Sequence, residues 1–182
     1  MPLFNDNAPL IIPPHPGFVS GKYYASSIHA SVSVLSYSTA YVYYTYFYVP
    51  YQQNFTRVAI YSNSTFSSPE NMRFGVYEVV SGMPSTLVAD LGSISFINPG
   101  AKEIICSITL TAGWYAIAIA FNPSSITLSS PTLYLNYMLG ASGVLTNFSG
   151  YRAPFVYGSF PSTAVLTNIT ETNSPLVWLK AS

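Results

Sequence analysis

The chain has 182 residues, and only 7% of them are charged: six acidic and six basic residues balance to a net charge of zero. The basic residues are scattered and form no stripe or patch, which argues against the electrostatic footprint of a nucleic-acid-binding protein. No run approaches the ~18 consecutive apolar residues of a membrane-spanning helix, so we expect no membrane span.

The first 20 residues predict an extended N-terminal arm. They contain five prolines, which fix φ and favour extended or polyproline conformations. Leu10, Ile11 and Ile12 give this arm an apolar segment with which it can contact this chain or a neighbour. The same stretch has no basic start and no long apolar core, so we expect no signal peptide and synthesis in a cytosol.

Residues 21–182 predict a single β-sandwich domain. Short segments of apolar, aromatic and β-branched residues are separated by turns rich in Gly, Pro, Asn and Ser, and no segment shows a convincing helical period. We therefore expect an all-β fold, an antiparallel and jelly-roll-like sandwich. The expected strands are 31–38, 40–50, 56–62, 72–80, 87–96, 101–110, 113–121, 132–139 and 175–181, with a turn-rich stretch at 140–175.

Residues 113–121 predict a central strand of this sandwich. Tyr115, Ile117, Ile119 and Phe121 fall on one face, and Trp114 and three alanines alternate with them on the other. Both faces are apolar, so we expect both to be covered. The small alanine side chains let another layer approach closely.

Residues 37–51 are dense in tyrosine and carry no charge. Tyrosine joins a large apolar ring to one hydroxyl group and is favoured at contacts that stay partly wet. Alternation along a strand places Tyr41 and Tyr43 on one side, and Tyr44, Tyr46 and Tyr48 on the other. We expect one side to face the core and the other a partner, which makes these five tyrosines, with Leu10, Ile11 and Ile12, the candidate oligomer contacts.

The sequence offers few side chains for a catalytic or metal site. His15 lies among prolines and His29 precedes a strand, and the chain has no metal-ligand cluster, phosphate loop or nucleophile elbow. Four acids fall in or beside strands: Glu70, Glu78, Asp90 and Glu103. Solvated charges on a sheet face explain them most simply, and the alternative is a pair of glycosidase carboxylates in one groove. We therefore expect no enzyme activity and no cofactor.

Cys106, Trp114 and Trp178 have simple structural interpretations. Cys106 is the only cysteine, so it forms no internal disulfide, and a small buried hydrophobe is expected because free Cys is commonly buried. The two tryptophans lie in apolar strands, which favours core packing. The alternative for them is a platform on which sugars stack.

Five segments of the chain carry strand and turn motifs: Arg57 to Tyr61, Arg73 to Tyr77, Gly82 to Gly92, Gly100 to Ile104 and Leu110 to Ala118. Through these segments residues 21–181 resemble a β-sandwich module of tailed-bacteriophage virion structural proteins. That module has an R-I-x-x-Y strand, an R-x-G-I-Y strand, a G-x-P-x-x-L-V-x-D-x-G turn and strand, a G-x-K-x-I strand and an L-x-x-G-x-Y-x-x-A strand. The resemblance implies the fold and a virion context, and it brings no catalytic residues. The tyrosine run is denser than in the family, and Cys106 replaces an aliphatic residue.

The first hypothesis is therefore a non-enzymatic virion structural protein, namely a capsid decoration (cement) protein. It would assemble as a symmetric oligomer, with a trimer favoured, and contact copies of itself and the major capsid or other virion proteins. The second hypothesis is a tail- or head-fibre module that binds a receptor or a host glycan. A glycan depolymerase and a protein of an archaeal virus or cell surface are further alternatives.

Overall fold

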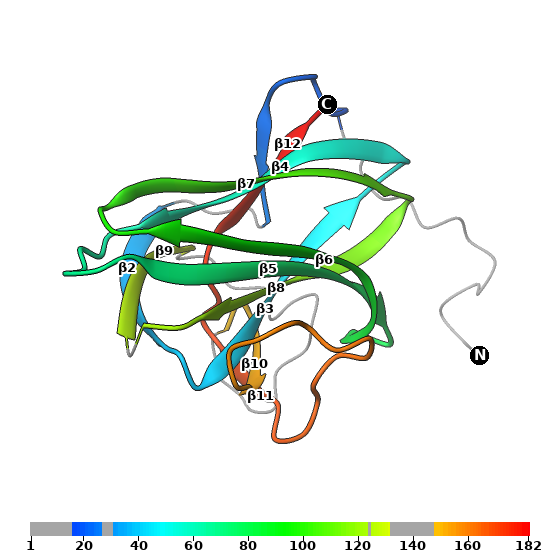
Figure 1. Ribbon diagram of the computed structural model, residues 1–182. Helices are drawn as coiled ribbons and strands as arrows, with labels where there is room; N and C mark the ends of the chain where they lie inside the picture. The colour runs from blue at the N-terminus through cyan, green and yellow to red at the C-terminus, as the bar shows by residue number, and fades with distance from the viewer. Residues whose placement is uncertain (1–15, 27–30, 124, 132–147) are drawn as a thin grey trace.

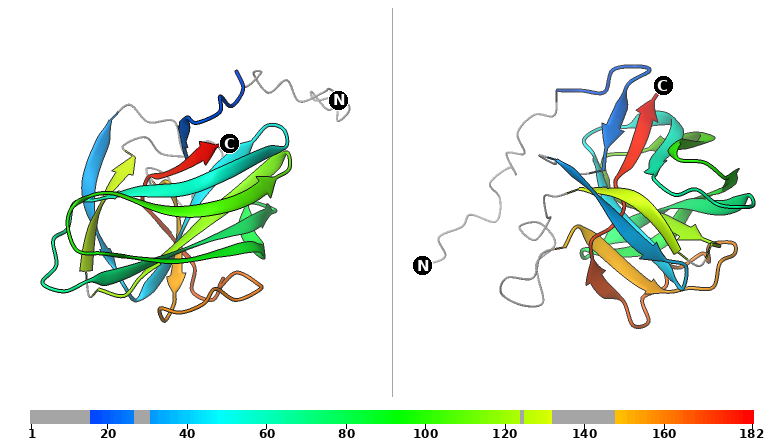
Figure 2. Two further views of the ribbon diagram at one scale, coloured as in Figure 1. Left: turned by 45° about the horizontal axis from the view of Figure 1, so that its top comes forward. Right: turned by 90° about the vertical axis from the view of Figure 1, so that its left-hand side faces the viewer.

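The computed structural model describes residues 16–26, 31–123, 125–131 and 148–182, and this part of the chain forms a β-sandwich without helices (Figures 1 and 2). The expected all-β sandwich is confirmed. The strand expected at 132–139, both histidines and the apolar residues Leu10, Ile11 and Ile12 of the arm lie outside the described residues.

Two six-stranded antiparallel sheets make up the sandwich. Sheet A has the order β1-β12-β4-β9-β2, and β7 also pairs with β4. Its strands are β1 (Tyr23–Ala25), β2 (Val32–Ser38), β4 (Gln53–Ser62), β7 (Gly100–Leu110), β9 (Ser125–Pro131) and β12 (Val177–Ala181).

Sheet B has the order β11-β10-β3-β8-β5-β6. Its strands are β3 (Tyr41–Val49), β5 (Glu70–Val80), β6 (Met83–Phe96), β8 (Gly113–Phe121), β10 (Gly150–Pro154) and β11 (Thr170–Thr172). The connection from β6 to β7 passes from sheet B to sheet A, so these two long strands lie on the same side of the sandwich (Figure 1).

The main core lies between the two sheets. Phe74 and Val76 of β5 and Ile119 of β8 meet Val58 and Ile60 of β4 there, and each of these side chains is at most 1% exposed. Burying such a side chain contributes about 1.5–3 kcal/mol relative to leaving it in water. Strand β8 lies between β3 and β5 and is buried on both faces from Tyr115 to Phe121, which confirms the central strand expected at 113–121.

Strand β6 begins four residues before the expected start at 87. Residues 83–86 were expected to turn, but Met83 and Pro84 pair with Val80 and Val79 of β5. Only Ser81 and Gly82 turn, and both have positive φ (51° and 78°). A two-residue hairpin turn with positive φ at both positions matches the twist of the flanking strands, so the ladder continues up to the turn.

A third layer covers the outer face of sheet B. Residues 155–169, here called the cover segment, cross this face below the sheets in Figure 1. Phe160 and Ala164 of this segment pack in a second core with Ala116, Ala118 and Ala120 of β8. The alanines leave room for this layer, as their small size predicted. Strands β10 and β11, which flank the cover segment, and β9 were not predicted because their Ser, Thr and Gly content is typical of loops.

The described end of the arm, residues 16–20, packs on the sandwich. The ring of Phe18 lies 4.7 Å from that of Tyr24 and 5.3 Å from that of Phe55, measured between centroids. The N–H group of Phe18 donates a hydrogen bond to the hydroxyl group of Tyr51 at 2.5 Å. The chain is therefore fixed to the sandwich before β1 begins.

Candidate interaction surfaces

The tyrosine-rich strand β3 is covered on both faces by its own chain. Tyr43 is 2% exposed and lies between the sheets, whereas Tyr44 and Tyr46 are at most 1% exposed and lie in the second core. The amide of Val165, in the cover segment, donates to the Tyr44 hydroxyl group at 3.1 Å. This placement corrects the expectation for these three tyrosines: the cover comes from the same chain rather than from a partner.

The two remaining tyrosines of the candidate set, Tyr41 and Tyr48, are half-buried. The guanidinium group of Arg152 lies 4.6 Å from the centre of the Tyr41 ring, within the range of a cation–π contact. The ring of Tyr48 lies 5.0 Å from that of Trp114, between centroids. Trp114 packs against the second core, in line with the core packing expected for it. Tyr41 and Tyr48 stay candidate partner contacts.

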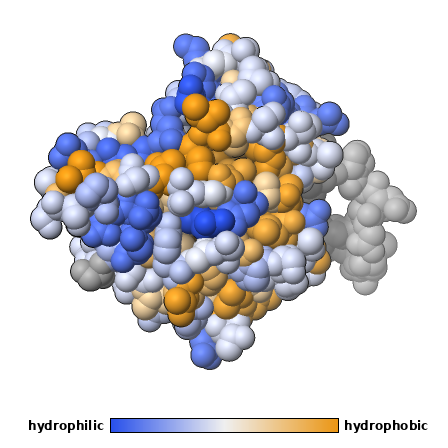
Figure 3. Space-filling model, viewed as in Figure 1, coloured by the Kyte–Doolittle hydropathy of each residue, from blue (hydrophilic) through white to orange (hydrophobic). Residues whose placement is uncertain are grey.

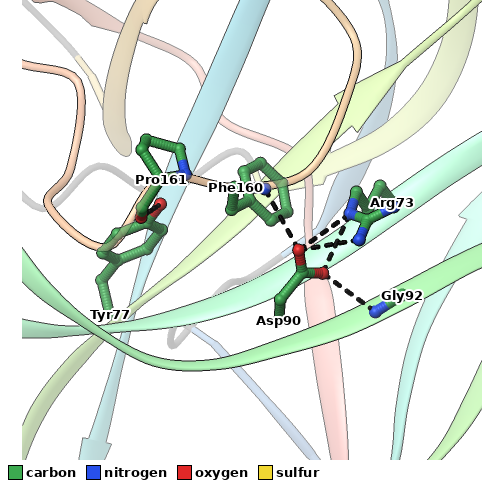
Figure 4. A network of polar contacts seen from close by, with 6 residues as sticks. All are labelled: Arg73, Tyr77, Asp90, Gly92, Phe160 and Pro161. Carbon is green, nitrogen blue, oxygen red and sulfur yellow. Dashed lines mark hydrogen bonds and ion pairs between the residues drawn. The ribbon is translucent and has the colours of Figure 1, made fainter.

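An ion pair holds the cover segment against sheet B (Figure 4). Arg73 of β5 donates to both carboxylate oxygens of Asp90 on β6, from Nε to Oδ1 at 2.9 Å and from the terminal nitrogen to Oδ2 at 2.8 Å. The same carboxylate accepts the N–H groups of Gly92 at 3.0 Å and Phe160 at 3.1 Å. Partial burial raises the pKa of Asp90, but these hydrogen bonds outweigh it and hold the pKa below its ordinary value.

Close packing around Phe160 completes this attachment. A Cβ atom added at Gly75 would lie 2.6 Å from the Phe160 ring, so only glycine allows the ring to sit so near β5. The hydroxyl group of Tyr77 donates to the carbonyl oxygen of Pro161 at 2.8 Å (Figure 4). Arg73, Asp90 and Tyr77 therefore serve attachment of the cover segment, and the arrangement is structural.

A second polar cluster lies on the outer face of sheet A. The hydroxyl group of Tyr23 donates to Glu103 Oε1 at 2.6 Å, and Arg57 lies 3.6 Å from the same carboxylate. The ammonium group of Lys180 lies 5.4 Å from the centre of the Tyr23 ring. Trp178 alternates along β12 with the core residues Val177 and Leu179, and it is half-buried on this outer face.

Trp178 and Cys106 differ from what their strands predicted. Core packing was expected for Trp178, but the tryptophan faces away from the core because Val177 and Leu179 occupy the inner positions of β12. Cys106 is half-buried rather than buried, and its thiol donates to the carbonyl oxygen of Phe55 at 3.7 Å. Burial raises the pKa of this thiol, which keeps it protonated.

The long edge of β7 is a surface that the sequence analysis missed. Within the described ranges β7 pairs only with β4, so its other side presents backbone N–H and C=O groups. Ile105 points outward from this strand and is 74% exposed. Figure 3 shows apolar surface gathered on the side of the molecule where β6 and β7 lie. The neighbouring isoleucines at 104 and 105 were the available signal, because in a strand they must point to opposite faces.

Two of the four carboxylates singled out in the sequence lie on different sheets. Asp90 and Glu103 each pair with an arginine, one on sheet B and the other on sheet A. Among the described residues, no group of three His, Cys, Asp or Glu side chains is placed to hold a metal ion. The described part also contains no helix long and apolar enough to cross a membrane. Comparison with protein-family models and with curated proteins finds no match to this chain.

Proposed function

We propose that this chain is a non-enzymatic structural protein of a virus particle, acting as a decoration protein that binds the capsid surface. The observation that carries the proposal is that, among the described residues, the outer side of β7 is unpaired and its Ile105 is exposed, which suits assembly with neighbouring copies on a shell. An unpaired strand edge with apolar side chains is a site where another polypeptide chain can bind. The resemblance to phage virion modules supplies the virion context.

The distribution of polar groups supports a binding role. The Arg73–Asp90 pair attaches the cover segment, and Glu103 is held by Tyr23 and Arg57. With a net charge of zero, the chain lacks the charge repulsion that keeps soluble proteins apart. Association through its apolar surface therefore meets little electrostatic resistance.

Multivalency makes modest contacts sufficient on a shell. Apolar burial contributes about 25 cal/mol per Å², and much of it offsets the lost freedom of the bound molecule. A repeated shell offers many sites, so that an oligomer can bind through several contacts at once. A trimer is the oligomer we propose, since it matches the threefold sites of capsid shells.

Copy number in purified particles tests this proposal. Quantitative mass spectrometry of particles should find hundreds of copies of this chain for each particle. A fibre protein would be present in a few dozen copies at most, and a chain absent from particles would contradict the proposal outright.

A second candidate function, a fibre module that binds a host glycan, rests on the outer face of sheet A. Tyr23 and Trp178 lie there with Arg57 and Glu103, and aromatic rings beside charged groups suit a sugar ligand. Glycan-array binding that is lost on Trp178→Ala and kept on Val156→Ala would favour this function. Val156 is a suitable control because it is 90% exposed and lies in the cover segment over the other sheet.

A further inference from the structure

We propose that β7 pairs with β7 of a second copy of this chain, antiparallel and around a two-fold axis at Ile105. The pairing would join the two A sheets into one continuous sheet across the contact. It deepens the self-assembly part of the proposed function by naming the surface and the partner. Its test needs no virus particle, so the two proposals can fail separately.

Among the described residues, a segment of the chain covers part of the β6 edge, whereas none pairs with the outer side of the neighbouring β7 edge. On β6, the N–H group of Leu87 donates to the carbonyl oxygen of Ser162 at 2.9 Å, and Ser85 accepts from the N–H group of Ala164 at 2.8 Å. The cover segment therefore satisfies part of the β6 edge. Among the described residues, no comparable segment pairs with the outer side of β7, which is 11 residues long.

The exposed side chain on this strand favours pairing. Ile105 is the most exposed large apolar residue in the described strands, at 74%. Directly opposed residues in an antiparallel pair have Cβ atoms about 4.5–5.5 Å apart. An axis at Ile105 therefore places the two Ile105 side chains in contact and removes apolar surface from water.

The register with its axis at Ile105 also avoids repulsion between like charges. A continuous sheet requires opposed residues to lie on the same face, so each pair must join two odd-numbered or two even-numbered residues. In the proposed register Glu103 faces Ser107, and Lys102 faces Ile108. An axis at residue 103 would oppose two glutamates, and an axis at residue 102 would oppose two lysines, which is destabilising.

The contact is two-fold and so is separate from a threefold interface. If trimers form as proposed, β7 pairs link one trimer to the next, and an assembly in which every β7 is paired has an even number of chains. A shell protein with both kinds of contact can form a continuous net around a particle.

Replacing Ile105 by lysine tests the contact in solution. The native chain should form an assembly with an even number of chains, measured by light scattering or native mass spectrometry at rising concentration. Ile105→Lys should lower that number to the unit that forms without the β7 contact, a monomer or a trimer, because it opposes two positive charges at the axis. Val156→Lys makes the same chemical change at an exposed site away from β7 and should keep the native mass.

Two outcomes would overturn the proposal. One is a native chain that stays monomeric, or has an odd number of chains, up to its highest soluble concentration. The other is an unchanged mass for Ile105→Lys. Because the side chain of Ile105 faces solvent within one chain, the thermal unfolding midpoint of this variant should match that of Val156→Lys at a concentration low enough to dissociate the β7 contact, which shows that both are folded.

A cysteine at position 105 gives an independent and positive test. Opposed residues in an antiparallel pair have Cα atoms about 4.5–5.5 Å apart, within the range that a disulfide spans. In a Cys106→Ala background, Ile105→Cys should form a covalent dimer under mild oxidation that reductant reverses. If it cross-links no faster than Val156→Cys in the same background, the register is refuted.

Discussion

A buried tyrosine keeps its ring from water but still needs a partner for its hydroxyl group. For three tyrosines of the second core this partner is backbone: Tyr44 accepts from Val165, Tyr46 donates to Gly82 at 2.7 Å, and Tyr77 donates to Pro161. Two of these contacts fix the cover segment, and the contact of Tyr46 reaches the β5–β6 turn. Tyrosine therefore serves in this chain as an internal attachment between backbone segments.

Burial of these tyrosines predicts a loss of stability at alkaline pH. Burial raises the pKa of Tyr44 to about 12, even though the hydrogen bond from Val165 lowers it, and burial also raises the pKa of Tyr46 and of Tyr77. The unfolded chain releases these protons near pH 10, before the folded chain does, so folding loses free energy as pH rises through that window. The expected slope is about 1.4 kcal/mol per pH unit for each such tyrosine.

Urea unfolding between neutral pH and pH of about 11 measures this slope. Tyr44→Phe should reduce the slope by about 1.4 kcal/mol per pH unit while it removes one hydrogen bond. Full tyrosine ionisation near pH 10, seen by ultraviolet absorbance with the fold intact, would contradict the assigned burial.

At the scale of elements, the long strands could be predicted from the sequence, whereas the cover segment could not. The long strands could be predicted because β-branched and aromatic residues dominate them, and β8 was identified as central from its two apolar faces. The cover segment could not be predicted, since its attachments join Asp90 to Phe160 and Tyr44 to Val165 over long sequence separations. Without that layer, the second face of β3 resembles a surface for a partner.

The Asp90 carboxylate should be essential for holding the cover segment. Asp90→Asn keeps the shape of the side chain but leaves one acceptor oxygen where Gly92, Phe160 and Arg73 now use two. Hydrogen bonds to a charged group contribute about 1.5–3 kcal/mol, so we expect a loss of about 2 kcal/mol in the free energy of unfolding. Hydrogen exchange at the Phe160 amide should also become faster.

A control on the same sheet separates this effect from a general loss of charge. Glu78→Gln changes an exposed carboxylate on β5, and a surface change of this kind should stay within about 0.5 kcal/mol. If both variants lost equal stability, or the Phe160 amide kept its protection in Asp90→Asn, the attachment assigned to Asp90 would be refuted.

At the scale of the whole molecule, the sandwich is covered by its own chain, and its surface carries little charge to oppose association with other chains. Two cores and a cover segment bury the tyrosine-rich strand, so the fold does not depend on a partner to hide it. Among the described residues, the surfaces that nothing pairs with or covers include the edge of β7 and the outer face of sheet A. The proposed decoration role therefore rests on these surfaces rather than on the buried tyrosines of β3.

The most direct test of this role is an electron-microscopy reconstruction of purified particles. The account predicts density for this sandwich at every equivalent position of the capsid shell, with β7 at a two-fold contact between neighbouring copies. Density confined to a tail or fibre, or a shell that lacks this chain, would contradict it.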